Sequence, residues 1–125
     1  MTPKQYAAKG TEHAHQVALF MWAQQSGIPE LKLMFAIPNG GERNAIVATR
    51  LKAEGVKSGV PDIMLPIARH GRHGLFVELK KPGGRASASQ NDWISELQAQ
   101  GYGACVAVGW DAARDIILQY LQKDD

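Results

Sequence analysis

The sequence predicts an α/β fold in which helices flank a mixed β-sheet, and two observations carry this prediction. Short apolar segments bounded by glycine and proline, typical of buried strands, alternate with longer segments that have apolar residues at helical spacing. The chain has 125 residues, of which 45% are hydrophobic and 21% charged, a balance that fits one globular domain. The expected order of elements is α-β-α-β-β-α-β-α.

The N-terminal part is expected to supply the first helix. Residues 1–10 are expected to form a flexible leader ahead of a single domain that spans residues 11–125. The apolar-rich segment 13–25 contains neither glycine nor proline and ends before Gly27, which predicts a helix. Thr11 stands where a side-chain cap for its first turn is expected.

A strand and a second helix are expected next. Residues 31–37 are short and apolar and are followed by a Pro-Asn-Gly-Gly run, which is typical of a strand that leads into a turn. Residues 42–54 predict a helix that ends at Gly55. The positions expected on its buried side are Ile46, Val47 and Leu51.

The centre of the chain predicts a β-hairpin. Segments 62–67 and 75–79 are continuous apolar runs, as buried strands are. They are joined at residues 69–74 by Arg-His-Gly-Arg-His-Gly, a basic, glycine-containing turn. Its two histidines make a poor zinc site, because no cysteine or further histidine accompanies them.

A helix, a strand and a last helix complete the order. Residues 90–97 carry side chains at helical spacing, and residues 102–108 have the pattern of another buried strand. Asp111 is expected to cap the final helix. The single cysteine, Cys105, excludes an intramolecular disulfide and a zinc site built from cysteines.

Charged residues interrupt the apolar pattern at one end of the predicted hairpin. Asp62 begins the first strand, and Glu78 and Lys80 lie two apart near the end of the second. Side chains alternate along a strand, so Glu78 and Lys80 share a face, and pairing of the hairpin brings Asp62 close to them. Two carboxylates and an ammonium then converge, and carboxylate oxygens are ligands that a hard cation such as Mg²⁺ takes.

A second interpretation of this pair stays open. Glu78 and Lys80 could form a solvated salt bridge on an exposed face, an arrangement that is common and contributes little to stability. Asp62 at the matching strand end argues against it, because carboxylates buried together are costly unless a cation compensates them. The pattern therefore favours a metal site suited to hydrolysing phosphodiester bonds.

These residues carry a resemblance to a known nuclease family. The runs Gly59-Val60-Pro61-Asp62 and Glu78-Leu79-Lys80, in this order, are similar to the active-site signature of the PD-(D/E)XK nucleases. With the segments around them, the chain resembles the VRR-NUC (virus-type replication-repair nuclease) family in a stand-alone, single-domain form, from about residue 12 to residue 121. The longer segments that match are residues 38–41, 51–62 and 77–84. The resemblance implies a restriction-endonuclease-like mixed sheet flanked by helices.

The resemblance also implies roles for individual residues. Asp62, Glu78 and the backbone carbonyl of Leu79 would hold Mg²⁺ or Mn²⁺, and Glu12 would complete the metal site, directly or through a water. Lys80 would orient the attacking water. From the sequence alone, Glu12 could instead only complement the N-terminus of its helix.

Further residues are assigned to the site or to its surroundings. Gln90 matches a glutamine to which the resemblance gives a catalytic role, and it also completes a capping-box sequence with Ser87; the two roles are compatible. Several polar residues that flank the site in sequence are candidates for binding DNA, since phosphate contacts require cations near the metal, although a solvated surface would also account for them. These residues are Asn39, Arg43, Arg50, Lys52, Lys57, Lys81 and Arg85.

The expected function is metal-dependent endonucleolytic hydrolysis of DNA. The resemblance implies a preference for branched DNA, such as four-way (Holliday) junctions or flaps, a homodimer with two sites, and a role in DNA repair. Two alternatives remain at this point: a catalytically silent DNA-binding module and a sequence-specific, restriction-type endonuclease.

The net charge and the hydropathy of the sequence limit the classes of partner and the location that we expect. The net charge of +2 permits nucleic acid as a partner without requiring it. No apolar run approaches the ~18 residues of a membrane span, and the N-terminus has no signal-peptide core, so we expect a cytoplasmic protein without membrane contacts. The habits of the family suggest a phage protein that acts in a bacterial host.

Overall fold

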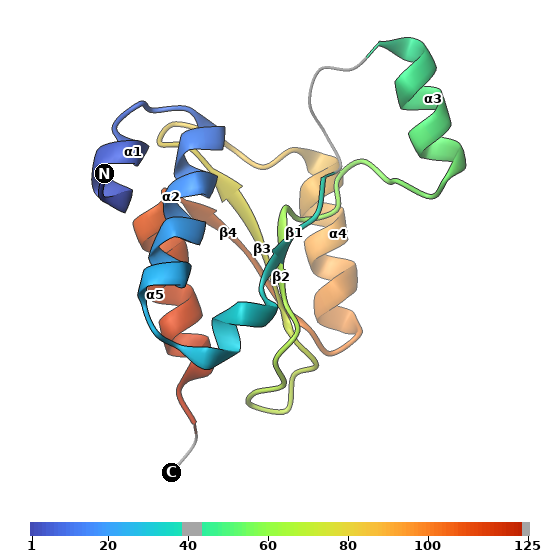
Figure 1. Ribbon diagram of the computed structural model, residues 1–125. Coiled ribbons are helices and arrows are strands. Elements are labelled where there is room, and N and C mark those ends of the chain that lie inside the picture. Colours follow the sequence, from blue (N-terminus) through green and yellow to red (C-terminus); the bar gives the residue numbers. More distant parts are fainter. Residues whose placement is uncertain (39–43, 124–125) are drawn as a thin grey trace.

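A four-stranded mixed sheet with helices on both faces forms the centre of the molecule (Figure 1). The structure is a computed structural model that describes residues 1–38 and 44–123. In their order across the sheet, the strands are β1 (Phe35–Ala36), β2 (Ile63–Leu65), β3 (Leu75–Lys80) and β4 (Gly103–Val108). The first two pairs are antiparallel, and β3 and β4 are parallel. The α/β class and the mixed sheet predicted from the sequence are confirmed.

The predicted hairpin is present. β2 and β3 pair with Ile63 opposite Val77, and both side chains are buried. Other elements cover the hairpin on both faces, which is why its strands have continuous apolar sequences. This register places Asp62, just before β2, beside the strand end that carries Glu78.

Two helices cover one face of the sheet and a third covers the other (Figure 1). α2 (Glu12–Gln25) and α5 (Trp110–Leu121) pack together on the first face, and α4 (Ala88–Ala99) lies on the second. Thr11 caps α2 as predicted, with its Oγ1 accepting a hydrogen bond from the Ala14 N–H at 3.0 Å. The largest fully buried apolar side chains of the core are Leu19, Ile63, Leu65, Val77, Leu79 and Ile117.

The segment between α2 and the hairpin differs from its prediction. In place of one strand over residues 31–37, the chain forms a 3₁₀ helix, η1 (Pro29–Leu33), and then the two-residue strand β1. The fixed φ of Pro29 suits the first position of a helical turn. The turn buries Leu31 in the core.

The start of the last helix also differs from its prediction. Asp111 is not the cap, because α5 begins one residue earlier, at Trp110. The preceding Gly109 occupies the cap position with a φ of 91°, a conformation that residues with a side chain rarely adopt. Gly109 brings no side chain to cap the first turn.

Residues 1–10, for which the sequence predicts a flexible leader, contain a short helix, α1 (Pro3–Ala7). Thr2 and Gln5 form a reciprocal capping box, with hydrogen bonds of 2.8 and 3.1 Å. Ala7 is buried where α1 packs on α2. The signal is visible in the sequence, because a threonine, a proline and a glutamine stand at the cap, first and third positions.

Helix α3 (Ala45–Ala53) projects from the rest of the fold (Figure 1). The prediction that Ile46, Val47 and Leu51 form a buried side is wrong: none of the residues of α3 is buried, and Ile46 is 73% exposed. The helix forms from its local signals, including a cap in which Asn44 Oδ1 accepts a hydrogen bond from the Val47 N–H at 2.9 Å. Its apolar pattern therefore marks a helix without marking a core position.

Gly59 should tolerate no side chain. Its φ is +89°, and a Cβ at this position would overlap Ser89 Oγ and lie 2.8 Å from Trp93 Cδ1, both in α4. We expect Gly59→Ala to lower the free energy of unfolding by about 2–4 kcal/mol, because backbone strain and overpacking add. Urea denaturation measures the loss.

The matched control is Gly55→Ala. Gly55 has a similar φ of +100°, but a Cβ there would meet nothing within 4 Å. This variant should show only the backbone strain, about 1 kcal/mol. Equal losses in the two variants would contradict the close packing of the Gly59 segment on α4.

Candidate active site

Three carboxylates from distant parts of the chain meet at one end of the sheet. Glu12 is the first residue of α2, Asp62 immediately precedes β2, and Glu78 lies near the C-terminal end of β3. One oxygen of each lies within 4.8 Å of the others. Within residues 1–38 and 44–123, this is the one group of three or more potential metal-ligating side chains.

Asp62 is held through both its side chain and its backbone. Its Oδ2 accepts a hydrogen bond from the Leu79 N–H at 3.1 Å. Its carbonyl oxygen accepts one from the Ile37 N–H at 2.6 Å. The register of the hairpin predicted from the sequence thus produces a direct contact between the two strand ends.

Glu78 is the most deeply buried side chain of the cluster, with an exposed fraction of 1%. Its Oε2 accepts a hydrogen bond from Gln90 Nε2 at 3.2 Å and lies 3.5 Å from Lys80 Nζ. Its Oε1 has no hydrogen-bond partner in the part of the chain that the structure describes. These contacts exclude the alternative of a solvated salt bridge on an exposed face.

Burial raises the pKa of the Glu78 carboxyl to about 8. Desolvation is the largest cause, and the negative charge of Asp62 adds to it, whereas Lys80 acts in the opposite direction. Without a bound cation, the cluster therefore retains a proton at neutral pH. A cation at this position would favour the ionised form.

Lys80 places its ammonium group between two of the carboxylates. Nζ lies 3.5 Å from Glu78 Oε2 and 3.9 Å from Glu12 Oε1. Glu78 and Lys80 share a face of β3 because they are two residues apart, as predicted. When all three carboxylates are ionised, Lys80 offsets only one of their charges.

Gln90 contacts both its capping partner and the carboxylate cluster. In the capping box of α4, its Oε1 accepts a hydrogen bond from the Ser87 N–H at 2.8 Å, and Ser87 Oγ accepts one from the Gln90 N–H at 3.2 Å. Its Nε2 donates to Glu78. The amide therefore joins the start of α4 to the buried carboxylate.

This donor set fits a hard divalent cation. Mg²⁺ and Mn²⁺ prefer oxygen ligands, and the cluster supplies carboxylate oxygens with a net negative charge. Glu78 Oε1 is a buried acceptor that no described donor satisfies, and a buried unsatisfied oxygen is costly without a partner. A cation would provide that partner.

Among the residues assigned to DNA binding, those that the structure describes lie on α3 and in two loops. Asn39 and Arg43 lie outside the described residues. Arg50 and Lys52 are in the last turn of α3. Three more residues lie in loops, of which Lys57 follows α3, and Lys81 and Arg85 follow β3.

Sequence reasoning assigned no role to His15. This residue is buried one helical turn after Glu12, and its Nδ1 accepts a hydrogen bond from the Trp110 N–H at 3.1 Å. His13 and His15 are two residues apart and so do not share a helix face, and neither gives a clear signal in the sequence. The histidines of the basic turn, His70 and His73, lie at the opposite end of β3 from the carboxylates.

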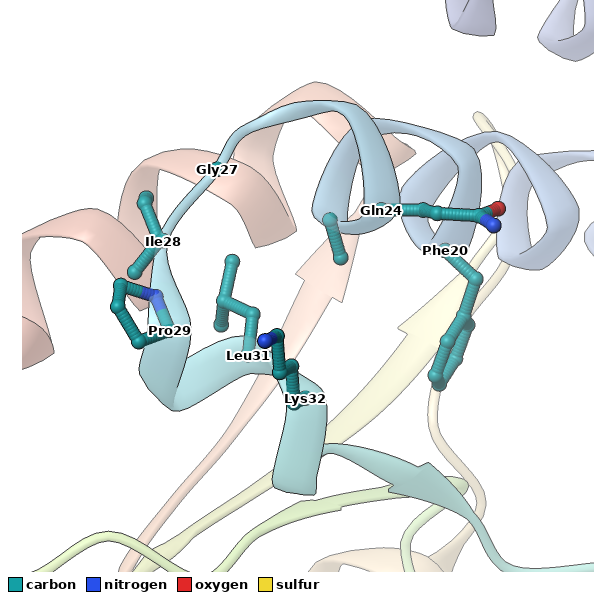
Figure 2. A pocket seen from close by; sticks show the side chains of 8 residues that line it. Phe20, Gln24, Gly27, Ile28, Pro29, Leu31 and Lys32 are labelled. Carbon is teal, nitrogen blue, oxygen red and sulfur yellow. The ribbon is translucent and has the colours of Figure 1, made fainter.

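A separate hollow of about 530 Å³ lies between the end of α2 and η1 (Figure 2). Phe20, Gln24 and Lys32 are among the residues that line it, and none of the described carboxylates does. At 1.5 Å per residue, Gln24 is about 18 Å along α2 from Glu12. This hollow is therefore distinct from the carboxylate cluster.

Comparison with known proteins identifies the family. A family model of the VRR-NUC domain matches residues 10–110. The chain belongs to the VRR-NUC family. A solved structure named "VRR_NUC domain protein" has 33% sequence identity and a TM-score of 0.79, and the match covers 92% of this chain and 91% of that one. A search of curated proteins gives no match.

Membership of the VRR-NUC family confirms the resemblance seen in the sequence and its restriction-endonuclease-like mixed sheet. The family is one of nucleases, and nucleic acid is the substrate that it implies. The acidic cluster is a possible site for the divalent metal of such an enzyme. None of the described helices is long and apolar enough to cross a membrane.

The raised pKa of Glu78 should make the metal-free VRR-NUC domain less stable as the pH rises. The carboxyl has an ordinary pKa of 4.5 and a pKa of about 8 in the fold, so the folded protein binds more protons between these values and loses stability as they dissociate. At ~1.4 kcal/mol per pKa unit, we expect a loss on the order of 4 kcal/mol between about pH 5 and pH 9. Urea denaturation in the presence of EDTA measures it.

Glu78→Gln provides the control for this titration. The amide keeps the shape of the side chain but does not ionise, so the stability of this variant should change much less over the same range. Added Mn²⁺ should stabilise the wild type most at high pH. The same pH dependence in both proteins would contradict the assignment of the shift to Glu78.

Proposed function

We propose that this VRR-NUC domain is a DNA endonuclease that depends on Mg²⁺ or Mn²⁺ and acts at the carboxylate cluster. The supporting observation is the convergence of Glu12, Asp62 and Glu78 within 4.8 Å, with the ammonium of Lys80 beside them. Structural salt bridges alone would not require three carboxylates around one lysine, since burying unpaired negative charge is costly.

The metal ligands in this proposal come from two strand ends and one helix. Asp62, Glu78 and Glu12 would bind the ion through their carboxylate oxygens, and the backbone carbonyl of Leu79 would be a further ligand. The Leu79 N–H donates to Asp62 Oδ2, which restrains this peptide. A bound Mg²⁺ or Mn²⁺ supplies a Lewis acid for a phosphate oxygen and lowers the pKa of a bound water.

In this proposal Lys80 acts on the reacting groups, whereas Gln90 acts on a metal ligand. Lys80 would orient the attacking water and stabilise negative charge on the phosphate in the transition state. Its ammonium is already held between carboxylates, so little reorganisation is needed. Gln90 binds Glu78 Oε2 and leaves Oε1 for the ion. Displacement of the 3′ oxygen in line with the water would give 5′-phosphate and 3′-hydroxyl ends.

Cleavage of DNA should depend on divalent metal, on Glu78 and on Lys80. We expect Glu78→Ala and Lys80→Ala each to lower kcat by at least about 100-fold, as removal of a ligand or of a transition-state contact does. The assay follows plasmid and branched oligonucleotide substrates with Mn²⁺ and with EDTA.

Glu96→Gln, which changes an exposed carboxylate of α4, is the control and should retain activity. Cleavage that persists in both Glu78→Ala and Lys80→Ala would indicate another site or a contaminating nuclease. If the wild type cuts no DNA in the presence of metal, a catalytically silent DNA-binding module becomes the better explanation.

We further propose that the preferred substrate is branched DNA and that the enzyme acts as a homodimer. A single domain of this size presents little surface to a duplex, and two sites related by a two-fold axis would match the symmetry of a four-way junction. Junction, flap and linear substrates of equal sequence, and junctions of scrambled sequence, test this. Cleavage that depends on the nucleotide sequence of the substrate and not on its branch structure would favour a restriction-type enzyme. A monomer in sedimentation experiments would contradict the dimer.

The basic residues around the site offer contacts to the DNA backbone. Arg50 and Lys52 matter most in this proposal, because α3 carries them away from the body of the fold (Figure 1). A projecting basic helix can reach phosphates that lie beyond the catalytic end of the sheet. Lys57, Lys81 and Arg85 would add contacts closer to the strand ends.

The double variant Arg50→Ala/Lys52→Ala should bind DNA more weakly and with less dependence on salt. Removing one phosphate contact lowers the slope of log K against log salt by about 0.9, so we expect a reduction of up to about 2. Fluorescence anisotropy over a series of salt concentrations measures it. The control Lys4→Ala/Lys32→Ala removes the same charge elsewhere, and an equal effect there would contradict a specific role for α3.

A further inference from the structure

An unusual hydrogen bond joins α2 to the start of α5. His15 is 7% exposed, and its Nδ1 accepts a hydrogen bond from the N–H of Trp110, the first residue of α5. The leading N–H groups of a helix have no partners within the helix, and Gly109 provides no side-chain cap. The imidazole of another helix therefore accepts a hydrogen bond from the first of these N–H groups, while Asp111 Oδ1 accepts a hydrogen bond from the Ala112 N–H at 3.1 Å.

The same turn is bound to the strand that carries Lys80. The Gly109 N–H donates to the carbonyl oxygen of Lys80 at 2.8 Å, and Lys80 lies opposite Val108 in the parallel pair of β3 and β4. Two successive peptide N–H groups thus link the imidazole of His15 to the backbone of Lys80.

On its other side, His15 is linked to the cluster through α2. Residues three apart share a helix face, and Glu12 lies three residues before His15. Glu12 Oε1 is 3.9 Å from Lys80 Nζ, so a small rotation or shift of α2 would change this distance. Glu12 is therefore connected through α2 to His15, the acceptor of the hydrogen bond. Lys80 is connected through Gly109 to Trp110, the donor of the same bond.

We propose that His15 is a positioning residue that fixes the placement of Glu12 against Lys80. Buried Ala14, Ala18 and Leu19 supply apolar packing for α2, which is non-directional, whereas a hydrogen bond has a preferred geometry. Among the described residues, the bond to Trp110 is the one hydrogen bond that links α2 to another element. The inference rests on the proposed function, because the placement matters through the metal site.

Two substitutions of His15 separate the hydrogen bond from the size of the side chain. His15→Asn keeps an acceptor close to the position of Nδ1, whereas His15→Leu keeps an apolar side chain of similar size without an acceptor. We expect His15→Leu to lower Mn²⁺ affinity by about 5-fold and kcat by about 10-fold, because a residue that orients a metal ligand is lost. KM for DNA should stay within about 2-fold of the wild-type value. His15→Asn should stay within about 2-fold of the wild type in both.

Calorimetric titration with Mn²⁺ and steady-state cleavage of DNA give these values. The control is Tyr120→Phe, which removes the hydrogen bond from the Tyr120 hydroxyl to the Ile67 carbonyl, 2.6 Å long, at the other end of α5. It should destabilise α5 without changing Mn²⁺ affinity or kcat. Equal losses in Tyr120→Phe and His15→Leu would overturn the inference, because a general loss of stability would then explain both.

A spectroscopic test does not depend on activity. An imidazole whose Nδ1 accepts a hydrogen bond carries its proton on Nε2, and ¹⁵N NMR reports this tautomer. In His15→Leu, the side-chain carboxyl ¹³C signal of Glu12 should shift, whereas in His15→Asn it should not. A proton on Nδ1, or a Glu12 signal unchanged in His15→Leu, would overturn the inference.

Failure of the inference and failure of the proposed function can be told apart. Suppose that the wild type binds Mn²⁺ and cuts DNA. If His15→Leu then has the Mn²⁺ affinity and kcat of the wild type, or if His15→Asn loses as much of both as His15→Leu does, only the role of His15 is overturned. If the wild type neither binds Mn²⁺ nor cuts DNA, the proposed function fails, and the NMR spectra still decide whether His15 places Glu12.

Discussion

The burial of the Glu78 carboxyl at the end of β3 is the constraint on which the site depends. A carboxylate in this position is costly unless its oxygens are satisfied, and the fold satisfies one of them with Gln90 and with Lys80. The other oxygen is left without a described partner, and Asp62 adds a second negative charge. The metal-free site is therefore a local source of instability, and a cation is the group that removes it most directly.

This arrangement also explains why each contact around Glu78 comes from a different element. A single neighbouring residue could pair the charge, but it could not leave one oxygen open while holding the other. Gln90 can do so because its amide is fixed at both ends, by Ser87 in the capping box and by Glu78 itself. Because both polar atoms of the amide are hydrogen-bonded, the side chain loses its conformational entropy during folding. It is then already in place for the reaction.

The sequence was sufficient to predict the hairpin and the group formed by Asp62, Glu78 and Lys80. Both predictions rest on local rules: alternation along a strand, and the register that a hairpin imposes on its two ends. The placement of Glu12 could be stated only through the family resemblance, because it depends on how α2 docks on the sheet. His15 was assigned no role from the sequence or from the resemblance, because its partner Trp110 lies in another helix.

Where prediction failed, tertiary context decided the outcome. The apolar residues 31–37 were compatible with a strand, but Pro29 begins a helical turn that buries Leu31 and leaves Phe35 exposed. The apolar spacing of α3 predicted a buried face, yet Ile46 is exposed because the helix projects from the sheet. Periodicity reports that a segment can form an amphipathic helix, and it does not report whether a surface is available to cover it.

The position of the cluster follows from the topology of the sheet. β3 and β4 are parallel, and each leads from its C-terminal end toward the first turn of a helix, β3 to α4 and β4 to α5. Those two first turns carry Gln90 and Trp110, and the first turn of α2 adds Glu12. The N-terminal ends of three helices thus converge on the strand ends, where their partial positive charges oppose the repulsion among the carboxylates. The same ends favour a phosphate, so the feature that makes the acidic cluster tolerable also suits it to a DNA backbone.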